Sequence, residues 1–178
     1  MKHLHYPRHE HPQKKLLGFI DGLEGGFAIF AGIVAGLSFT TMNRNVLVAT
    51  AIVGIIVNAV NAATIRYSSE HYYDELDGHE MPNGFRQYFV PAVIEFVLYM
   101  SISVLSVLPL MLIPSLHIAV SMMIATCLVI LFISGLIRGS LLKTRPLSDG
   151  IELAIGGSIM IGIGALAGFV ATHIIATL

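Results

Sequence analysis

Five long apolar stretches dominate this sequence, and they limit what the chain can fold into. A helix that crosses the hydrocarbon core of a bilayer needs about 20 mostly apolar residues, because each residue adds about 1.5 Å and the core is roughly 30 Å thick. The stretches that meet this length occupy residues 17–39, 46–65, 88–113, 117–137 and 150–177. The sequence therefore predicts an all-α integral membrane protein with five transmembrane helices.

The composition excludes several classes of protein. Charged residues make up only 12% of the chain and hydrophobic residues 55%, whereas a soluble domain carries about 25% charged residues. The formal net charge of −1 provides no basic field that would hold a nucleic acid. The sequence has no Ser/His/Asp or HExxH arrangement, so we predict that the protein is not an enzyme and has no prosthetic group.

Basic residues predict the orientation of the helices and divide the chain into parts. Lys and Arg gather in short loops on the cytoplasmic side of a membrane, and here only Arg44, among the 10 Lys and Arg residues, falls on the opposite side. We therefore expect a cytoplasmic His-rich tail at residues 1–16, a transmembrane domain at 17–178 and a cytoplasmic acidic and His-containing loop at 66–87. No organelle address is readable, so we expect the plasma or inner membrane rather than an organelle membrane.

Polar side chains inside the predicted spans are the main functional candidates. A charge at the centre of a span costs about 2.5–3.5 kcal/mol on insertion scales, so such residues usually serve a function. By the rise per residue, most of these candidates lie within about 6–15 Å of the cytoplasmic boundary. Oxygen ligands at one level suit divalent cations and protons, although the acids could instead reach water and the amides could join helices. The predicted translocation residues are Asp21, Glu24, Asn58, Asn61, Glu95 and Glu152.

The predicted cytoplasmic loop offers a second set of metal ligands. Its carboxylates and imidazoles recur four residues apart, which is the spacing of neighbours on one face of a helix. Such groups suit Fe²⁺, Mn²⁺ or Zn²⁺, so the loop is a candidate for collecting metal, and the alternative is a solvated acidic connector. The candidate residues are Glu70, His71, Asp74, Glu75, His79 and Glu80.

Glycines in the first and last stretches provide a packing signal. Spacings of four residues between small side chains let membrane helices approach closely. We expect either a homodimer packed along one of these faces or plain helix packing. The glycines are Gly18, Gly22, Gly25, Gly26, Gly32 and Gly36 in the first stretch, and Gly156, Gly157, Gly162, Gly164 and Gly168 in the last.

The first stretch also carries a familiar motif. Asp21-Gly22-Leu23, then Phe27-Ala28 and Ala31-Gly32-Ile33-Val34-Ala35-Gly36, resembles the first-helix signature of the vacuolar iron transporter family. Gly135 to Gly139, followed by Arg145-Pro146-Leu147 and a glycine-rich last helix, is similar to that family's C-terminal pattern. The resemblance implies a dimer of five-helix subunits that moves Fe²⁺, and often Mn²⁺, out of the cytosol in exchange for protons, with Asp21 in the path.

The second stretch departs from that pattern. The family commonly has a Met followed four residues later by a Glu, and the matching positions here are Ala62 and Arg66. Glu24 stands where the family usually has an apolar residue, and the short loop replaces a long metal-binding insert. We expect a proton-coupled exporter of Fe²⁺ or Mn²⁺. The alternatives are a non-transporting membrane sensor or assembly protein that kept the fold, and a transporter of another cation.

Overall fold

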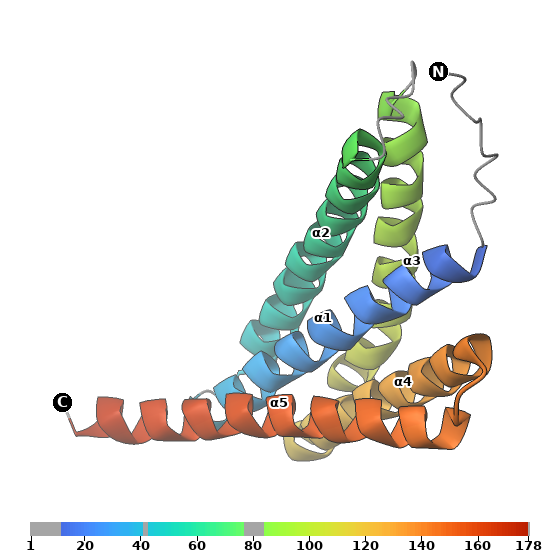
Figure 1. The fold of residues 1–178 in the computed structure, drawn as a ribbon. Coiled ribbons are helices and arrows are strands. Elements are labelled where there is room, and N and C mark those ends of the chain that lie inside the picture. Colours follow the sequence, from blue (N-terminus) through green and yellow to red (C-terminus); the bar gives the residue numbers. More distant parts are fainter. Residues whose placement is uncertain (1–11, 41–42, 77–83, 178) are drawn as a thin grey trace, which may run out of the picture.

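The computed structural model describes residues 12–40, 43–76 and 84–177. These described residues form five helices and no strand (Figure 1). Each helix covers one of the predicted apolar stretches, as the all-α prediction requires. The helices are α1 (Pro12–Thr40), α2 (Arg44–Leu76), α3 (Gly84–Leu112), α4 (Leu116–Leu142) and α5 (Pro146–Ala176).

Four of the helices have the length and apolar character of membrane spans. Within the described residues these spans are Arg44–Ser69, Tyr88–Leu112, Leu116–Leu142 and Pro146–Ile174, and α1 contributes a shorter apolar segment at Gly25–Thr40. Large apolar side chains such as Val57 on α2 and Ile163 on α5 are about 60% uncovered by protein, which suits contact with lipid. The chain is therefore an integral membrane protein built from helices.

The helix α2 extends well beyond the predicted end of its span. It continues from Ile65 to Leu76, so the first half of the predicted 66–87 loop is helical. Residues 66–76 contain no Gly or Pro, so nothing in the local sequence ends the helix there. The first such residues come later, at Gly78 and Pro82. At the other end of α2, Arg44 donates hydrogen bonds to the carbonyl oxygens of Leu110 (3.1 Å) and Pro114 (2.6 Å), which ties α2 to the α3–α4 turn.

The helix α1 organises the molecule. It packs against each of the other four helices, while α2 pairs with α3 and α4 pairs with α5. Figure 1 shows α2 and α3 side by side at a wide angle to α5, with α1 running between the two pairs. Phe27, Phe30 and Val34 of α1 are at most 1% exposed, so the core of the protein surrounds this helix.

Glycines join α1 to α5. A Cβ atom added to Gly164 would lie 2.5 Å from the carbonyl carbon of Gly32, and one added to Gly36 would collide with the Gly164 carbonyl oxygen. Only glycine permits this approach of the two backbones. This part of the glycine pattern therefore serves packing within one chain. Gly156 and Gly162, in contrast, have no neighbouring heavy atom within 4 Å, apart from their own local chain.

Candidate functional site

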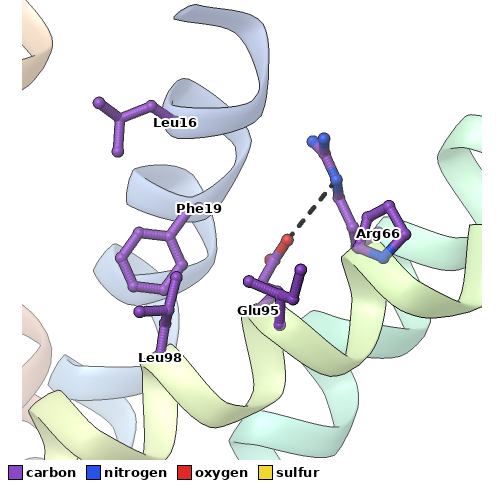
Figure 2. Close-up of a pocket in the computed structure, with 7 residues that line it drawn as sticks. Leu16, Phe19, Arg66, Glu95 and Leu98 are labelled. Atoms are coloured by element: carbon purple, nitrogen blue, oxygen red, sulfur yellow. Dashed lines mark ion pairs between the residues drawn. The ribbon is translucent and has the colours of Figure 1, made fainter. Parts of the chain in front are cut away.

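A buried carboxylate on α3 is the centre of the candidate site. Glu95 is only 7% exposed, although it lies about 10 Å beyond the start of the span at Tyr88. Its Oε2 atom is 3.7 Å from Nε of Arg66 on α2, within the range of an ion pair. Figure 2 shows the two side chains pointing toward each other beside a cavity of about 310 Å³. The cavity lining comprises Leu16, Phe19, Arg66, Pro91, Ile94, Glu95 and Leu98.

The carboxylate of Glu95 lies close to Gly22, at a point where α1 also approaches Ala62 of α2. A Cβ atom on Gly22 of α1 would lie 3.3 Å from Oε1 of Glu95 and 3.4 Å from Cβ of Ala62 on α2. A larger side chain at Gly22 would press on the carboxylate. The glycine in the first-helix motif therefore makes room for an acid from α3, and Ala62 keeps the facing part of α2 small.

One helical turn beyond Gly22 on α1, a hydrogen bond joins α1 to α2. Nδ2 of Asn58 donates a hydrogen bond to the carbonyl oxygen of Gly26, with a separation of 3.1 Å. On α3, Tyr99 is fully buried, and its hydroxyl lies directly against Gly26, where a Cβ atom would collide with it. Polar groups from α2 and α3 thus meet α1 at one glycine. Asn61, which was predicted to act beside Asn58, is exposed.

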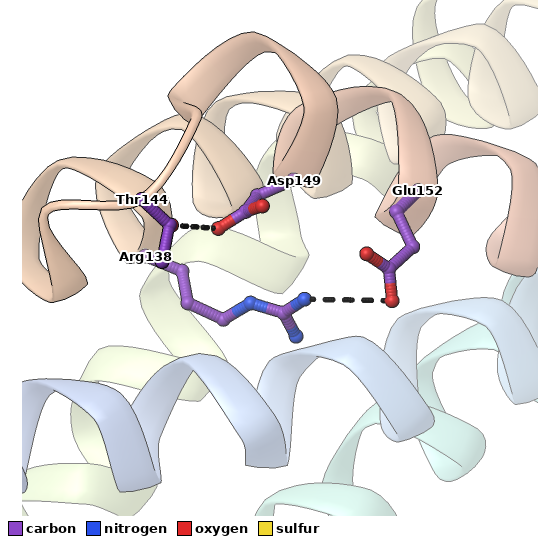
Figure 3. Close-up of polar contacts among 4 residues, drawn as sticks. All are labelled: Arg138, Thr144, Asp149 and Glu152. Carbon is purple, nitrogen blue, oxygen red and sulfur yellow. Dashed lines mark hydrogen bonds and ion pairs between the residues drawn. The ribbon is translucent and has the colours of Figure 1, made fainter.

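A different ion pair lies on the α4–α5 side of the molecule. Nη2 of Arg138 is 3.8 Å from Oε1 of Glu152, whose side chain is 72% exposed (Figure 3). Nearby, Oγ1 of Thr144 donates a 2.7 Å hydrogen bond to Oδ2 of Asp149. Glu95 pairs with an arginine of α2, and Glu152 pairs with an arginine of α4. That the two acids share one level in the membrane stays a prediction.

Several predicted residues have side chains outside the described part of the structure. Asp21 and Glu24 lie on α1, and Glu70, Asp74 and Glu75 lie on the last turns of α2. His79 and Glu80 lie outside the described residues altogether. Among the side chains that are described, no group of three or more His, Cys, Asp or Glu residues is placed to hold a metal ion.

The remaining candidate from the predicted loop, His71, lies among tyrosines. Its ring centroid is 6.2 Å from that of Tyr67, in a stacked arrangement, and 5.3 Å from that of Tyr88, edge to face. These contacts join the end of α2 to the start of α3. The position of His71 is therefore fixed in part by aromatic packing.

The sequence reasoning missed two features of the site. Arg66 was treated as a lost ligand, and its pairing with Glu95 depends on the packing of α2 against α3, which no local pattern reveals. The second feature is a set of buried hydroxyl side chains that follow Glu95 on α3, namely Tyr99, Ser103 and Ser106. Their spacing of three and four residues is a signal that the sequence already contains.

Comparison of the chain with models of known protein families gives no match, and comparison with curated proteins gives none either.

Proposed function

We propose that this protein moves a divalent cation, Fe²⁺ or Mn²⁺, out of the cytosol in exchange for protons. The observation that carries the proposal is the buried Glu95 carboxylate beside a cavity within a membrane span. An acidic side chain inside a span is costly, so its presence calls for a function. Carboxylate oxygens bind hard and borderline divalent cations, and they also take up and release protons.

Arg66 gives this site a specific mode of operation. Its guanidinium group neutralises Glu95 when no cation is present, which lowers the cost of keeping the acid in the membrane. A divalent cation that enters the cavity must displace this guanidinium from the carboxylate. In the pattern that the sequence resembles, an acid stands at the position of Arg66, and in this chain the carboxylate comes from the neighbouring helix α3 instead.

Further residues that were predicted from the sequence join the proposed cation path and its cytoplasmic entry. Asp21 and Glu24 belong to the same helix as Gly22, which contacts Glu95, and we assign both acids to the cation path. His71, Asp74 and Glu75, on the last turns of α2, would collect cations at the cytoplasmic side. The full arrangement is a five-span subunit with a cytoplasmic N-terminus that forms a homodimer in the plasma or inner membrane. Glu152 stands outside the proposed path, because it is exposed and pairs with Arg138.

A second candidate function is favoured by the same ion pair. If Arg66 holds Glu95 permanently, the site carries no cation, and the protein is a non-transporting sensor or assembly partner. The two functions differ in what happens when Arg66 loses its charge. In a transporter, Arg66→Gln removes a competitor and tightens cation binding, whereas in a non-transporting protein no variant moves the cation.

The test is transport by the purified protein in liposomes. Mn²⁺ and Fe²⁺ flux is measured with and without a pH gradient for the wild type, Glu95→Gln and the double variant Asp21→Asn/Glu24→Gln. Glu152→Gln is the matched control, because it removes an acid that also pairs with an arginine. We expect gradient-dependent flux that falls at least tenfold in the first two variants and persists in the control. Absence of flux for both metals, from protein that is folded, would overturn the proposal in favour of the non-transporting function.

A further inference from the structure

A polar stripe continues from Glu95 through the interior of the protein. Tyr99, Ser103 and Ser106 follow Glu95 on α3 at steps of four, four and three residues, which places all four side chains on one face of the helix. All three are 0% exposed. From Glu95 to Ser106 the stripe extends about 16 Å along the helix, or roughly half of the hydrocarbon core.

Two hydroxyls in this stripe lack partners. Among the buried side-chain oxygen and nitrogen atoms of the described residues, Oη of Tyr99 and Oγ of Ser103 lie near each other but make no hydrogen bond of normal geometry. A buried polar group without a partner costs several kcal/mol in a membrane, where no bulk water is available. Ordered water is the usual partner of such groups. Two of them one helical turn apart therefore mark a place for internal water.

Other hydroxyls on membrane-spanning helices of this protein avoid that cost locally. Oγ of Ser101, on the uncovered face of α3, donates a 2.7 Å hydrogen bond to the carbonyl oxygen of Val97. Thr126 on α4 makes the same bond to the carbonyl four residues earlier, at 2.8 Å. This is the ordinary behaviour of Ser and Thr in membrane helices. Ser103 does not follow it, although it lies only two residues from Ser101.

The helix α1 is shaped to receive the cytoplasmic half of the stripe. Gly22 and Gly26 are four residues apart and lie against Glu95 and Tyr99, which are also four residues apart. A side chain at Gly26 would displace the Tyr99 hydroxyl. Arg66, from α2, is a charged group paired with Glu95. The other titratable groups around the stripe are the buried Cys127 of α4, which lies beside Tyr99 and Ser106, and, by position in the α1 sequence, Asp21 and Glu24.

We propose that Glu95, Tyr99, Ser103 and Ser106, with water bound at the two unpartnered hydroxyls, form the route of the coupling proton. This inference rests on the proposed function and identifies its second ion path. The Ser106 hydroxyl donates a 2.6 Å hydrogen bond to the carbonyl oxygen of Ser103, so it serves the route as an acceptor that holds the first water. A proton that joins this water is passed on, because each water and the hydroxyls of Ser103 and Tyr99 accept a proton on one side as they release another on the other side. The carboxylate of Glu95 takes up the last proton and becomes a neutral carboxyl group. One proton moves in total, and only O–H bonds form and break.

The route also explains why the proton and the divalent cation do not occupy Glu95 at the same time. A neutral Glu95 no longer attracts a divalent cation or the Arg66 guanidinium by charge, so uptake of the proton and release of the cation accompany one another. The cavity beside Glu95 then provides the way out for the proton to the cytoplasmic side.

The experiment uses the wild type and two conservative variants in liposomes that contain a pH-sensitive dye. Tyr99→Phe keeps the ring and its 5.6 Å edge-to-face contact with Phe27 but removes the hydroxyl, and Ser103→Ala removes the second one. Ser101→Ala is the matched control on the uncovered face of the same helix. Proton entry and Mn²⁺ exit are measured together, and the Mn²⁺-dependent rise in Tm reports cation binding. We expect proton entry to fall at least tenfold in the two variants, with unchanged Mn²⁺ binding and an unaffected control.

The outcomes separate this inference from the proposed function. If the wild type exports Mn²⁺ without moving protons, or if Tyr99→Phe and Ser103→Ala exchange both ions as the wild type does, the proton route is overturned and the transporter stands. If the wild type moves no Mn²⁺, the transporter fails, and proton entry driven by a valinomycin potential decides the route. Proton entry that is lost in Tyr99→Phe then supports the route, and absence of proton entry in the wild type overturns it.

Discussion

The two arginine–glutamate pairs of this protein have similar lengths and different surroundings. Arg66 and Glu95 are 3.7 Å apart, with side chains 13% and 8% exposed, whereas Arg138 and Glu152 are 3.8 Å apart, with side chains 20% and 72% exposed. In the first pair both charges are enclosed by α1, α2 and α3. In the second pair the Glu152 carboxylate is mostly uncovered by protein. The distance between the two charges therefore does not predict how much an ion pair contributes to stability, because the cost of removing one partner depends on the burial of the other.

Removal of Arg66 is the change with the largest expected effect. Arg66→Leu leaves the enclosed Glu95 carboxylate without this counter-charge, so we expect a loss of about 3–5 kcal/mol in the free energy of unfolding. Denaturant titration in detergent micelles measures it. Arg138→Leu is the matched change in the open pair, with an expected loss below about 1 kcal/mol.

A double variant sharpens the same comparison. Arg66→Leu/Glu95→Leu removes both enclosed charges, so stability should return to near the wild-type value, since an apolar pair can replace a buried ion pair. Equal losses for Arg66→Leu and Arg138→Leu would contradict the difference in burial. If the double variant were as unstable as Arg66→Leu, the loss in the single variant would not come from leaving the Glu95 carboxylate without its counter-charge.

The next largest effect concerns the glycines that hold the α4–α5 pair to α1. Gly164→Ala places a methyl group 2.5 Å from the backbone of α1, so we expect a loss of about 1–3 kcal/mol from overpacking. Gly162→Ala, two residues away and without a neighbour within 4 Å, should instead gain about 0.4–1 kcal/mol, because alanine favours a helix. Thermal unfolding in detergent compares the two. Similar changes in Tm would contradict the observed packing of α1 on α5.

A smaller effect is expected at the hydrogen bond between α2 and α1. Asn58→Leu removes the donor to the Gly26 carbonyl while keeping a side chain that branches at Cγ, and such bonds in membranes contribute about 0.6 kcal/mol on average and up to about 1.7. The exposed Asn61→Leu should change the free energy of unfolding by less than about 0.5 kcal/mol. Denaturant titration of both variants measures this, and a larger loss in Asn61→Leu would reverse the assignment of these two residues.

The smallest effect is the coupling within the open pair. A double-mutant cycle of Arg138→Leu and Glu152→Gln should give about 0.2–1 kcal/mol, since the exposed Glu152 carboxylate is screened by water and salt. The coupling should fall further as salt is raised from low ionic strength to about 1 M. A coupling as large as that of Arg66 with Glu95, measured in the same way, would erase the contrast between the two sides of the molecule.

The sequence by itself determined the class of the protein and the approximate places of its helices, although not where α2 ends. Long apolar runs and few charges leave a membrane-spanning helical protein as the fold, because backbone polar groups in lipid must be satisfied within the helix. The spacing of Gly32 and Gly36 likewise predicts a face that allows close packing. These are local properties, and each is readable within a few turns of chain.

Only the tertiary structure decided which residues and helix faces contact one another. It placed the Gly32 and Gly36 face on α5 of the same chain, paired Arg66 with Glu95, and enclosed Tyr99 against Gly26. It also gave Glu95 and Glu152 different arginine partners, on different pairs of helices. The physical reason is that depth along a helix follows from the rise per residue, whereas the partner across an interface depends on the angle and rotation at which two helices pack.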